Sequence, residues 1–180
     1  MRKIPNEELG RWSEAEFESA KRHPIVFVLD NVRSMHNVGA AFRTADGFGI
    51  EKIYLCGITA KPPHRDINKA ALGATETIEW EHYDQTLDAI AELKEKGYTI
   101  VSVEQVEGST SLERLRLENN QKIALVFGHE VKGVDQEVVN QSDFAIEIPQ
   151  FGTKHSFNIS VSIGIVTWEI IKQELMGNGR

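Results

Sequence analysis

The residues best suited to chemistry lie in three short segments that are far apart in the chain. The first, residues 30–43, reads DNVRSMHNVGAAFR and combines side-chain amides with two guanidinium groups. Small and apolar residues follow at helical spacing, so Asn37 is expected to cap a helix. Exposed N–H groups at a helix start, with Arg43 further along, suit a phosphate or another anion. Taken alone, the same spacing also fits a capped helix with a solvated arginine.

The other two segments each follow a predicted strand. Gly128 ends the apolar run IALVF and comes two residues before Glu130, and a glycine there lets a ligand approach the backbone closely. The third segment, residues 148–162, carries Ser156 and Asn158 at the start of a predicted helix. Buried hydroxyl and amide groups at that place would hold a loop or a ligand through hydrogen bonds. Taken singly, an ordinary strand-to-helix turn and a plain N-cap explain these two segments.

Strands and helices alternate along the chain and would position these segments. Apolar runs rich in β-branched residues predict strands at residues 25–29, 53–56, 77–80, 98–103, 123–127 and 144–148. Amphipathic or capped stretches predict helices at residues 38–48, 68–72, 86–96 and 158–175, with a short one after Asp135. This alternation predicts an α/β domain with a mainly parallel sheet. Ligands of such sheets bind beyond the carboxyl ends of the strands, which is where the three segments lie.

Considered together, the three segments resemble the motifs of the SpoU/TrmH branch of the SPOUT methyltransferases. In order along the chain they read N-x5-N-x-G-x3-R-T-A, L-V-x-G-x-E-x-x-G and I-P-x-x-G-x3-S-x-N-x-S-V. The resemblance spans residues 25–171. The chain departs from the commonest pattern at His129, where asparagine or another small polar residue is more frequent, and at Phe157, where leucine is usual.

The resemblance implies a fold, a cofactor and an assembly. It implies a parallel α/β domain at residues 25–180 with a C-terminal deep trefoil knot, preceded by a helical lead-in at residues 1–24. It implies that S-adenosylmethionine sits in the knot, held mainly by backbone groups. Carried over by position, the cofactor-binding residues are Glu104, Gly128, Ile148 and Phe157.

The resemblance also implies a homodimer in which the catalytic arginine faces the cofactor of the partner subunit. The long C-terminal helix carries Trp168 and is a natural dimer element. Its apolar stripe consists of Ile159, Ile163, Val166 and Ile170.

The implied reaction is methyl transfer to a ribose 2′-hydroxyl of RNA, with Arg43 as the key catalytic group. A guanidinium keeps its proton in proteins and is an awkward base. Arg43 is therefore expected to bind the 2′-oxygen and the adjacent phosphate and to stabilise developing negative charge. Asn37 would hold the loop or the ribose, and Glu130 would orient Arg43 or the cofactor loop. Ser156 and Asn158 would fix Arg43 and the substrate phosphate.

Composition limits the classes of function. The net charge of −7 over 180 residues argues against a large, nonspecific RNA footprint. Arg33, Arg65 and Lys69 are the basic residues expected to touch RNA. The single cysteine, Cys56, lies in an apolar run and is expected to be a buried, inert thiol. The histidines lack metal-ligand spacing, and the chain has neither a long apolar span nor a secretory signal, so a metal-free cytoplasmic protein is expected.

Several alternatives remain at this level. No G-x-G-x-x-G follows the first strand and no G-K-[ST] loop occurs, which argues against a dehydrogenase or a nucleoside triphosphatase. A noncatalytic RNA-binding module on the same fold is the alternative from a different class, and methylation of a base nitrogen is a third. Because the chain has only a short lead-in, tRNA, with a D-loop guanosine as the candidate nucleotide, is slightly preferred over rRNA as the target.

Overall fold

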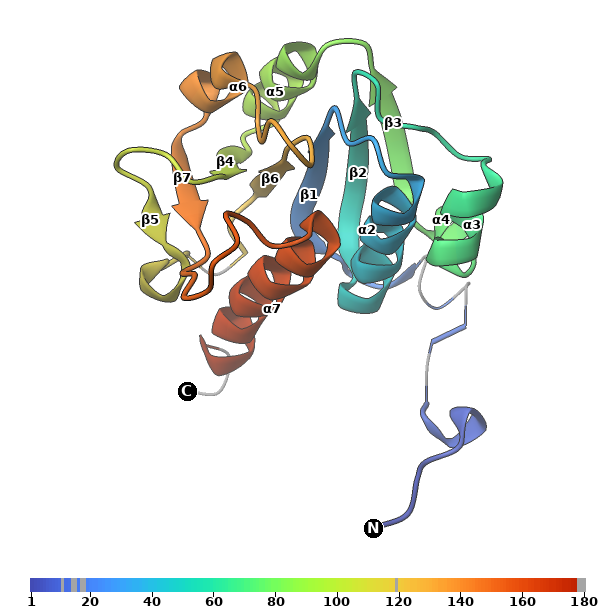
Figure 1. Cartoon of the computed structure of the whole chain (residues 1–180). Coiled ribbons are helices and arrows are strands. Elements are labelled where there is room, and N and C mark those ends of the chain that lie inside the picture. The colour runs from blue at the N-terminus through green and yellow to red at the C-terminus, as the bar shows by residue number, and fades with distance from the viewer. Residues whose placement is uncertain (11, 14–15, 17–18, 119, 178–180) are drawn as a thin grey trace.

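A seven-stranded sheet forms the centre of the computed structural model, which describes residues 1–10, 12–13, 16, 19–118 and 120–177 (Figure 1). The strand order is β3-β2-β1-β6-β4-β7-β5, and every neighbouring pair is parallel. The strands are β1 (His23–Asp30), β2 (Ile50–Cys56), β3 (Glu79–Tyr83), β4 (Thr99–Val103), β5 (Thr110–Ser111), β6 (Ile123–Phe127) and β7 (Phe144–Glu147). The predicted α/β class with a mainly parallel sheet is therefore confirmed.

Helices cover both faces of this sheet, as parallel sheets require (Figure 1). One face is covered by α2 (Met35–Phe48), α3 (Arg65–Ala71), α4 (Ala74–Thr77) and α7 (Ile159–Gly177). The other face is covered by α5 (Thr86–Glu95) and α6 (Gln136–Gln141). Two short 3₁₀ turns, η1 (Asn6–Glu8) and η2 (Leu112–Arg114), complete the described elements.

The central strand β6 shows why the sheet is buried on both sides. All five of its residues are buried, and they alternate between the two apolar clusters that flank the sheet. Phe127 meets Phe27 of β1 edge to face, with ring centroids 5.8 Å apart. This register places the carboxyl end of β6 beside that of β1, so the loops that follow these strands are neighbours.

The observed elements differ from the predicted ones mainly at their ends. The predicted strand at residues 77–80 begins only at Glu79, because Thr77 ends α4 and donates its hydroxyl to Asp46 Oδ1 at 2.9 Å. In the lead-in, Ser13 and Glu16 form the reciprocal hydrogen bonds of a capping box. Of the predicted helical lead-in at residues 1–24, the structure describes a 3₁₀ turn at Asn6–Glu8, helical residues at Glu16 and Ser19, and the start of β1 at His23. Residues 11, 14–15 and 17–18 lie outside the described part.

Helix α7 uses its predicted apolar stripe within its own chain. Ile159, Ile163, Val166 and Ile170 are all buried in the core cluster that includes α2. Trp168 is half exposed and lies against Phe48, with ring centroids 6.4 Å apart. The stripe is therefore not free for a second subunit, which corrects that part of the expectation.

Candidate active site

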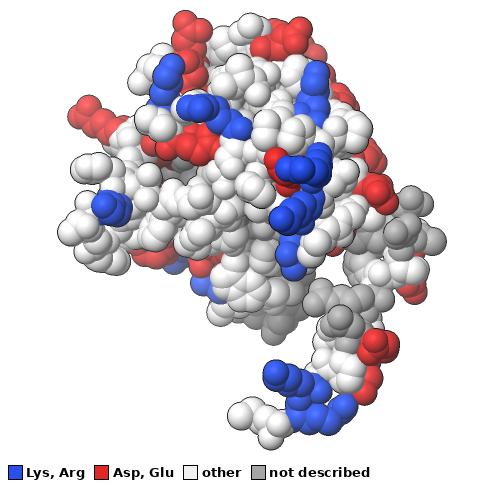
Figure 2. All heavy atoms as spheres, turned by 45° about the vertical axis from the view of Figure 1, so that its right-hand side comes forward, with Lys and Arg blue, Asp and Glu red and all other residues white. Residues whose placement is uncertain are grey.

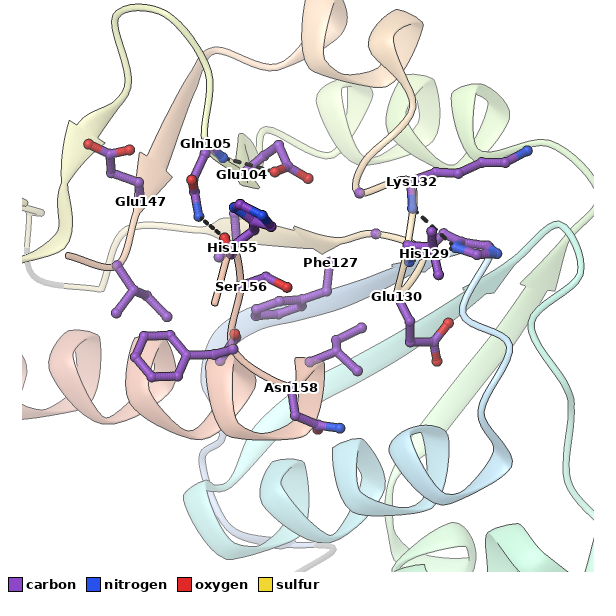
Figure 3. A pocket seen from close by; sticks show the side chains of 18 of the residues that line it. Glu104, Gln105, Phe127, His129, Glu130, Lys132, Glu147, His155, Ser156 and Asn158 are labelled. Atoms are coloured by element: carbon purple, nitrogen blue, oxygen red, sulfur yellow. Dashed lines mark hydrogen bonds between the residues drawn. The ribbon is translucent and has the colours of Figure 1, made fainter. Parts of the chain in front are cut away.

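A cavity of about 470 Å³ opens at the carboxyl ends of β4, β6 and β7 (Figure 3). Cavities of this size commonly bind small molecules and cofactors. Its wall comes from the loops after these three strands and from the first turn of α7. All four residues that were predicted to bind the cofactor line it: Glu104, Gly128, Ile148 and Phe157.

The loop after β6 forms one side of the cavity by folding back on itself. The backbone N–H of His129 donates to Gly133 O at 3.0 Å, and Gly133 N–H donates to His129 O at 2.8 Å. A Cβ at position 128 would overlap the backbone of Gly133 and Val134, so only glycine fits there. Gly133 has a φ of 73°, and a Cβ on it would overlap the Glu104 carboxylate. Both glycines are therefore required by close packing.

His129 holds the tip of this loop. Its Nδ1 accepts from the backbone N–H of Val131 at 3.0 Å and of Lys132 at 3.3 Å. The side chain therefore satisfies two backbone donors at the tip of the loop.

Glu104 fixes the opposite wall of the cavity. Its Oε2 accepts from the backbone N–H of Val134 at 2.8 Å, and its Oε1 accepts from Gln105 N–H at 2.9 Å. Gln105 in turn donates Nε2 to the backbone oxygen of His155 at 2.9 Å, a bond drawn in Figure 3. The loops after β4 and β6 and the segment before α7 are therefore tied together around the cavity.

Glu130 joins the cavity to helix α2. One carboxylate oxygen accepts from Ser34 N–H at 2.9 Å and from Asn37 Nδ2 at 3.0 Å, and the other accepts from Arg33 N–H at 3.0 Å. Partial burial acts to raise the pKa of Glu130, but the hydrogen bonds from Ser34, Arg33 and Asn37 outweigh it and hold that pKa below its usual range.

Asp30 makes the reverse connection and is 1% exposed. Its Oδ1 accepts from Thr86 Oγ1 at 2.5 Å and from Asn31 Nδ2 at 2.9 Å, and its Oδ2 accepts from the backbone N–H of Asp135 at 2.9 Å. Each of the two loops therefore sends one carboxylate to the backbone of the other. We call this arrangement, formed by Asp30 and Glu130, the reciprocal clamp.

The start of α2 differs from the predicted one. Ser34 is the N-cap, and its hydroxyl accepts from Asn37 N–H at 3.3 Å. The prediction that Asn37 caps the helix is wrong, because Asn37 lies inside the first turn and its amide binds Glu130 instead. The backbone donors of Arg33 and Ser34, just before the helix, also hold Glu130, so the anion expected at this helix start is supplied by the protein itself.

Arg43 does not reach the cavity of its own chain. It is exposed on α2 and does not line the cavity. Among the described residues it has no hydrogen-bond or ion-pair partner, so its guanidinium is available to another molecule.

The segment before α7 brings its polar side chains to the cavity mouth. Ser156, Phe157 and Asn158 line the cavity and are exposed. Asn158 caps α7: its Oδ1 accepts from Ser160 N–H at 2.9 Å and from Ser160 Oγ at 2.6 Å. The helix cap is therefore Asn158, and Ser156 lies two residues before the cap with its hydroxyl toward the cavity mouth (Figure 3).

The predicted RNA-binding residues lie outside the cavity. Arg33, Arg65 and Lys69 are exposed, and Arg65 contacts Asp66 at 3.2 Å. Figure 2 brings forward the side of the molecule that carries α3 and shows a column of Lys and Arg side chains there, with acidic side chains at its edges. The negative net charge is therefore unevenly spread over the surface.

Asp30 and Thr86 are the site residues that sequence reasoning missed. Both are polar and buried, and both stand at the boundary between a strand and a helix. An acidic residue directly after a buried strand was the available signal for Asp30, although nothing local indicated its partner Asp135.

The described part of the chain contains neither a cluster of metal-binding side chains nor a membrane-spanning helix. Within it, no group of three or more His, Cys, Asp or Glu side chains is arranged to hold a metal ion. No helix in that part is long and apolar enough to span a bilayer.

Fold and site together define a parallel α/β protein with a small-molecule cavity at the carboxyl ends of its strands. The chain belongs to the SpoU rRNA methylase family, whose model matches residues 24–168. The predicted membership of the SpoU/TrmH branch is thereby confirmed.

Two curated relatives illustrate the family. The chain is 30% identical over 161 residues to the 23S rRNA (guanosine-2'-O-)-methyltransferase RlmB of Neisseria meningitidis, covering 89% of this chain and 63% of the relative. It is 32% identical over 147 residues to the tRNA (guanosine(18)-2'-O)-methyltransferase of Borreliella burgdorferi, covering 82% of this chain and 66% of the relative. The chain thus spans slightly less than two thirds of the length of these relatives.

Solved structures confirm the fold. The A. aeolicus TrmH/SpoU tRNA modifying enzyme superposes with a TM-score of 0.81 at 26% identity, covering 92% of this chain and 82% of that one. An AdoMet-bound rRNA methyltransferase from Sinorhizobium meliloti superposes with a TM-score of 0.78 at 25% identity, covering 87% and 59%. The trefoil knot is implied by this shared fold.

Proposed function

We propose that this chain transfers a methyl group from S-adenosylmethionine to a ribose 2′-hydroxyl of RNA. The observation that carries the proposal is the reciprocal clamp, because it fixes the cavity and the arginine-bearing helix α2 as one unit. The names of both curated relatives, which are RNA 2'-O-methyltransferases, support the same chemistry.

The cavity fits S-adenosylmethionine in shape and charge. Phe127, Ile148 and Phe157 supply apolar wall for an adenine ring, and the tight turn at Gly128 leaves backbone groups within reach of a ligand. The lining residues include three glutamates and one lysine, which favours a ligand with a sulfonium and an ammonium group. The cofactor, when bound, supplies a methyl group activated by the positive sulfur.

Arg43 would complete the site from a second copy of the chain. Within one chain it does not line the cavity, and its guanidinium has no partner in the described part. In a homodimer it would meet the ribose and the neighbouring phosphate and stabilise negative charge on the 2′-oxygen. A face of α7 that carries Val161, Trp168 and Leu175, spaced by seven residues, is exposed and suits the subunit contact.

Among RNAs, we propose tRNA, and a guanosine of its D-loop, as the acceptor. The relative from Borreliella burgdorferi supports this choice by its name, tRNA (guanosine(18)-2'-O)-methyltransferase. Mass-spectrometric mapping of ribose methylation after incubation with tRNA and with rRNA tests it. Methylation of rRNA alone would contradict this choice of RNA.

Two variants test the chemistry and the shared site. Arg43→Ala should abolish methylation while S-adenosylmethionine affinity, measured by calorimetry, stays within about 3-fold, because Arg43 acts on the acceptor. Ile148→Asp should abolish cofactor binding by placing a carboxylate in the apolar wall. A chain that never binds the cofactor would be a noncatalytic module.

Mixing the two inactive variants distinguishes a shared site from a site within one chain. If Arg43 acts on the partner's cavity, each mixed dimer holds one intact site, and equal mixing restores about a quarter of wild-type activity. If Arg43 acts within its own chain, no mixed dimer has an intact site and activity stays at background. Copurification of one variant, untagged, with the other variant carrying an affinity tag confirms that mixed dimers form.

A further inference from the structure

The outward face of α3 combines two cations with an exposed leucine. Arg65, Lys69 and Leu72 follow each other at intervals of four and three residues, so they lie on one face of the helix. The opposite face carries Ile67 and Ala71, which are buried against the core. The side chain of Arg65 is 91% exposed, and Lys69 is exposed as well.

Leu72 is an unusual residue for its position. It closes α3 with φ 51° and ψ 44°, and its N–H donates to Asn68 O. Glycine or asparagine adopts this left-handed conformation at lower cost, whereas a bulky side chain is strained there. Leu72 is 67% exposed, so core packing does not compensate for the strain. Folding alone therefore gives no reason for leucine at this place.

Helix α3 packs closely against α2, the helix that carries Arg43. A Cβ on Gly39 of α2 would overlap Ile67 O and the Ala70 side chain, so the absence of a side chain at Gly39 lets the two helices pack closely. Arg43 follows Gly39 by one helical turn and lies on the same side of α2. A ligand held on the α3 face would therefore be kept near Arg43, on the side where Figure 2 shows the column of cations.

We infer that the α3 face binds an unpaired nucleotide of the RNA substrate, with Leu72 packed on the base and with Arg65 and Lys69 on the flanking phosphates. The inference rests on the proposed function and adds the part of the RNA that is recognised. An unpaired base exposes an apolar ring face, whereas a paired and stacked base does not. Charge complementarity selects the phosphates.

The test compares variants in binding to an unmodified tRNA transcript, to a short single-stranded RNA and to a duplex of the same sequence. Leu72→Gly should weaken binding of the transcript and of the single strand about 5-fold to 10-fold, with little effect on the duplex. Its Tm should equal or exceed that of the wild type, because glycine relieves the strained backbone. Leu72→Met should retain wild-type affinity, and the Kd for S-adenosylmethionine should not change in either variant.

Charge variants and a matched control complete the experiment. Lys69→Glu should weaken RNA binding and flatten its salt dependence, because one phosphate contact is lost. Lys94→Glu is the control, since Lys94 is exposed on α5 at the other face of the sheet. It should leave RNA affinity unchanged.

Three results would overturn the inference. Equal RNA affinity of Leu72→Gly and wild type would show that the leucine makes no contact. Equal weakening on duplex and single strand would show that no unpaired base is read. Dissociation of the dimer by Leu72→Gly, seen by light scattering, would assign Leu72 to a subunit contact. If wild-type protein binds none of the RNAs, the proposed function itself fails, which is a distinguishable outcome.

Discussion

Replacing Asp30 with asparagine tests the reciprocal clamp at its buried end. The carboxylate accepts three hydrogen bonds, from Asn31, Thr86 and the backbone of Asp135. Asparagine keeps the shape but has only one acceptor oxygen. If its NH₂ group takes the place of Oδ1, it faces the Thr86 and Asn31 donors; if it takes the place of Oδ2, it faces the Asp135 N–H. In either orientation, a donor lies against another donor and has no acceptor.

The expected cost follows from burial and from the loss of charge. A hydrogen bond to a charged group contributes about 1.5–3 kcal/mol, and an unsatisfied buried donor costs about 1–3 kcal/mol. Part of this cost is relieved by rotation of Thr86, so the net loss of unfolding free energy should be about 2–4 kcal/mol. For a chain of this size that corresponds to a fall in Tm of roughly 4–16 °C.

Urea unfolding and calorimetry check the magnitude and its location. The midpoint should fall without a change in the m-value, because the unfolded surface is unaltered. The Kd for S-adenosylmethionine should rise, since Asp135 ends the loop that walls the cavity. Asp143→Asn is the matched control: Asp143 accepts from one backbone donor, Ile100 N–H at 2.7 Å, away from the cavity. Asp143→Asn should lower the free energy of unfolding by less than Asp30→Asn does, and it should leave the Kd for S-adenosylmethionine unchanged.

An unaltered midpoint for Asp30→Asn would refute the claim that these hydrogen bonds hold the loops together. A lowered midpoint with unaltered cofactor affinity would refute the link between Asp30 and the cavity while leaving its structural role in place.

Three further predictions concern a glycine, the cysteine and a charge network. Gly133→Ala should weaken S-adenosylmethionine binding about tenfold or more by calorimetry, because alanine is strained at a φ of 73° and its Cβ displaces Glu104; unchanged affinity would argue against a rigid turn. Cys56 should resist iodoacetamide in the folded protein and react after unfolding, because burial, with the nearby Asp30 charge, raises the pKa of its thiol to about 12; rapid native labelling would contradict this. Hydrogen bonds from Lys96 and Tyr83 lower the pKa of Glu92 to about 2, so its contribution to the free energy of unfolding is complete above the unfolded pKa of about 4.3 and is lost as pH falls toward 2. Glu92→Gln should therefore make the free energy of unfolding fall less steeply with decreasing pH in this range. An unchanged pH dependence would exclude this contribution.

Much of the architecture could be predicted because its signals are local. The apolar run at residues 123–127 has the bounds of β6, since a strand covered on both faces leaves no polar position. The cap of α6 by Asp135 is also local, with Oδ1 accepting from Glu137 N–H at 2.9 Å. The residues predicted to bind the cofactor came from the family resemblance, and their convergence on one cavity follows from the strand order.

What could not be predicted depends on contacts between distant parts of the chain. Asn37 has the right residue type for an N-cap, but Ser34 is the N-cap of α2. The reason is that Glu130, from the loop after β6, binds the backbone N–H groups of Arg33 and Ser34 and so fixes the start of the helix there. The apolar stripe of α7 gives no sign of whether it meets its own sheet or another subunit. A periodic pattern identifies a buried face without naming the surface that buries it.

The construction of the cavity wall has a thermodynamic consequence. Its lining begins with Val103 and ends with Ser162, and it draws on three strands and the start of the last helix. No part of the chain that lacks α7 has this wall, so a ligand of the cavity binds the complete fold and not the unfolded chain. At a concentration 100 times its Kd, such a ligand would add about 2.7 kcal/mol to the free energy of unfolding. Melting temperature measured against ligand concentration would then report cofactor affinity directly, and the resident cofactor would act as a stabiliser of the protein that uses it.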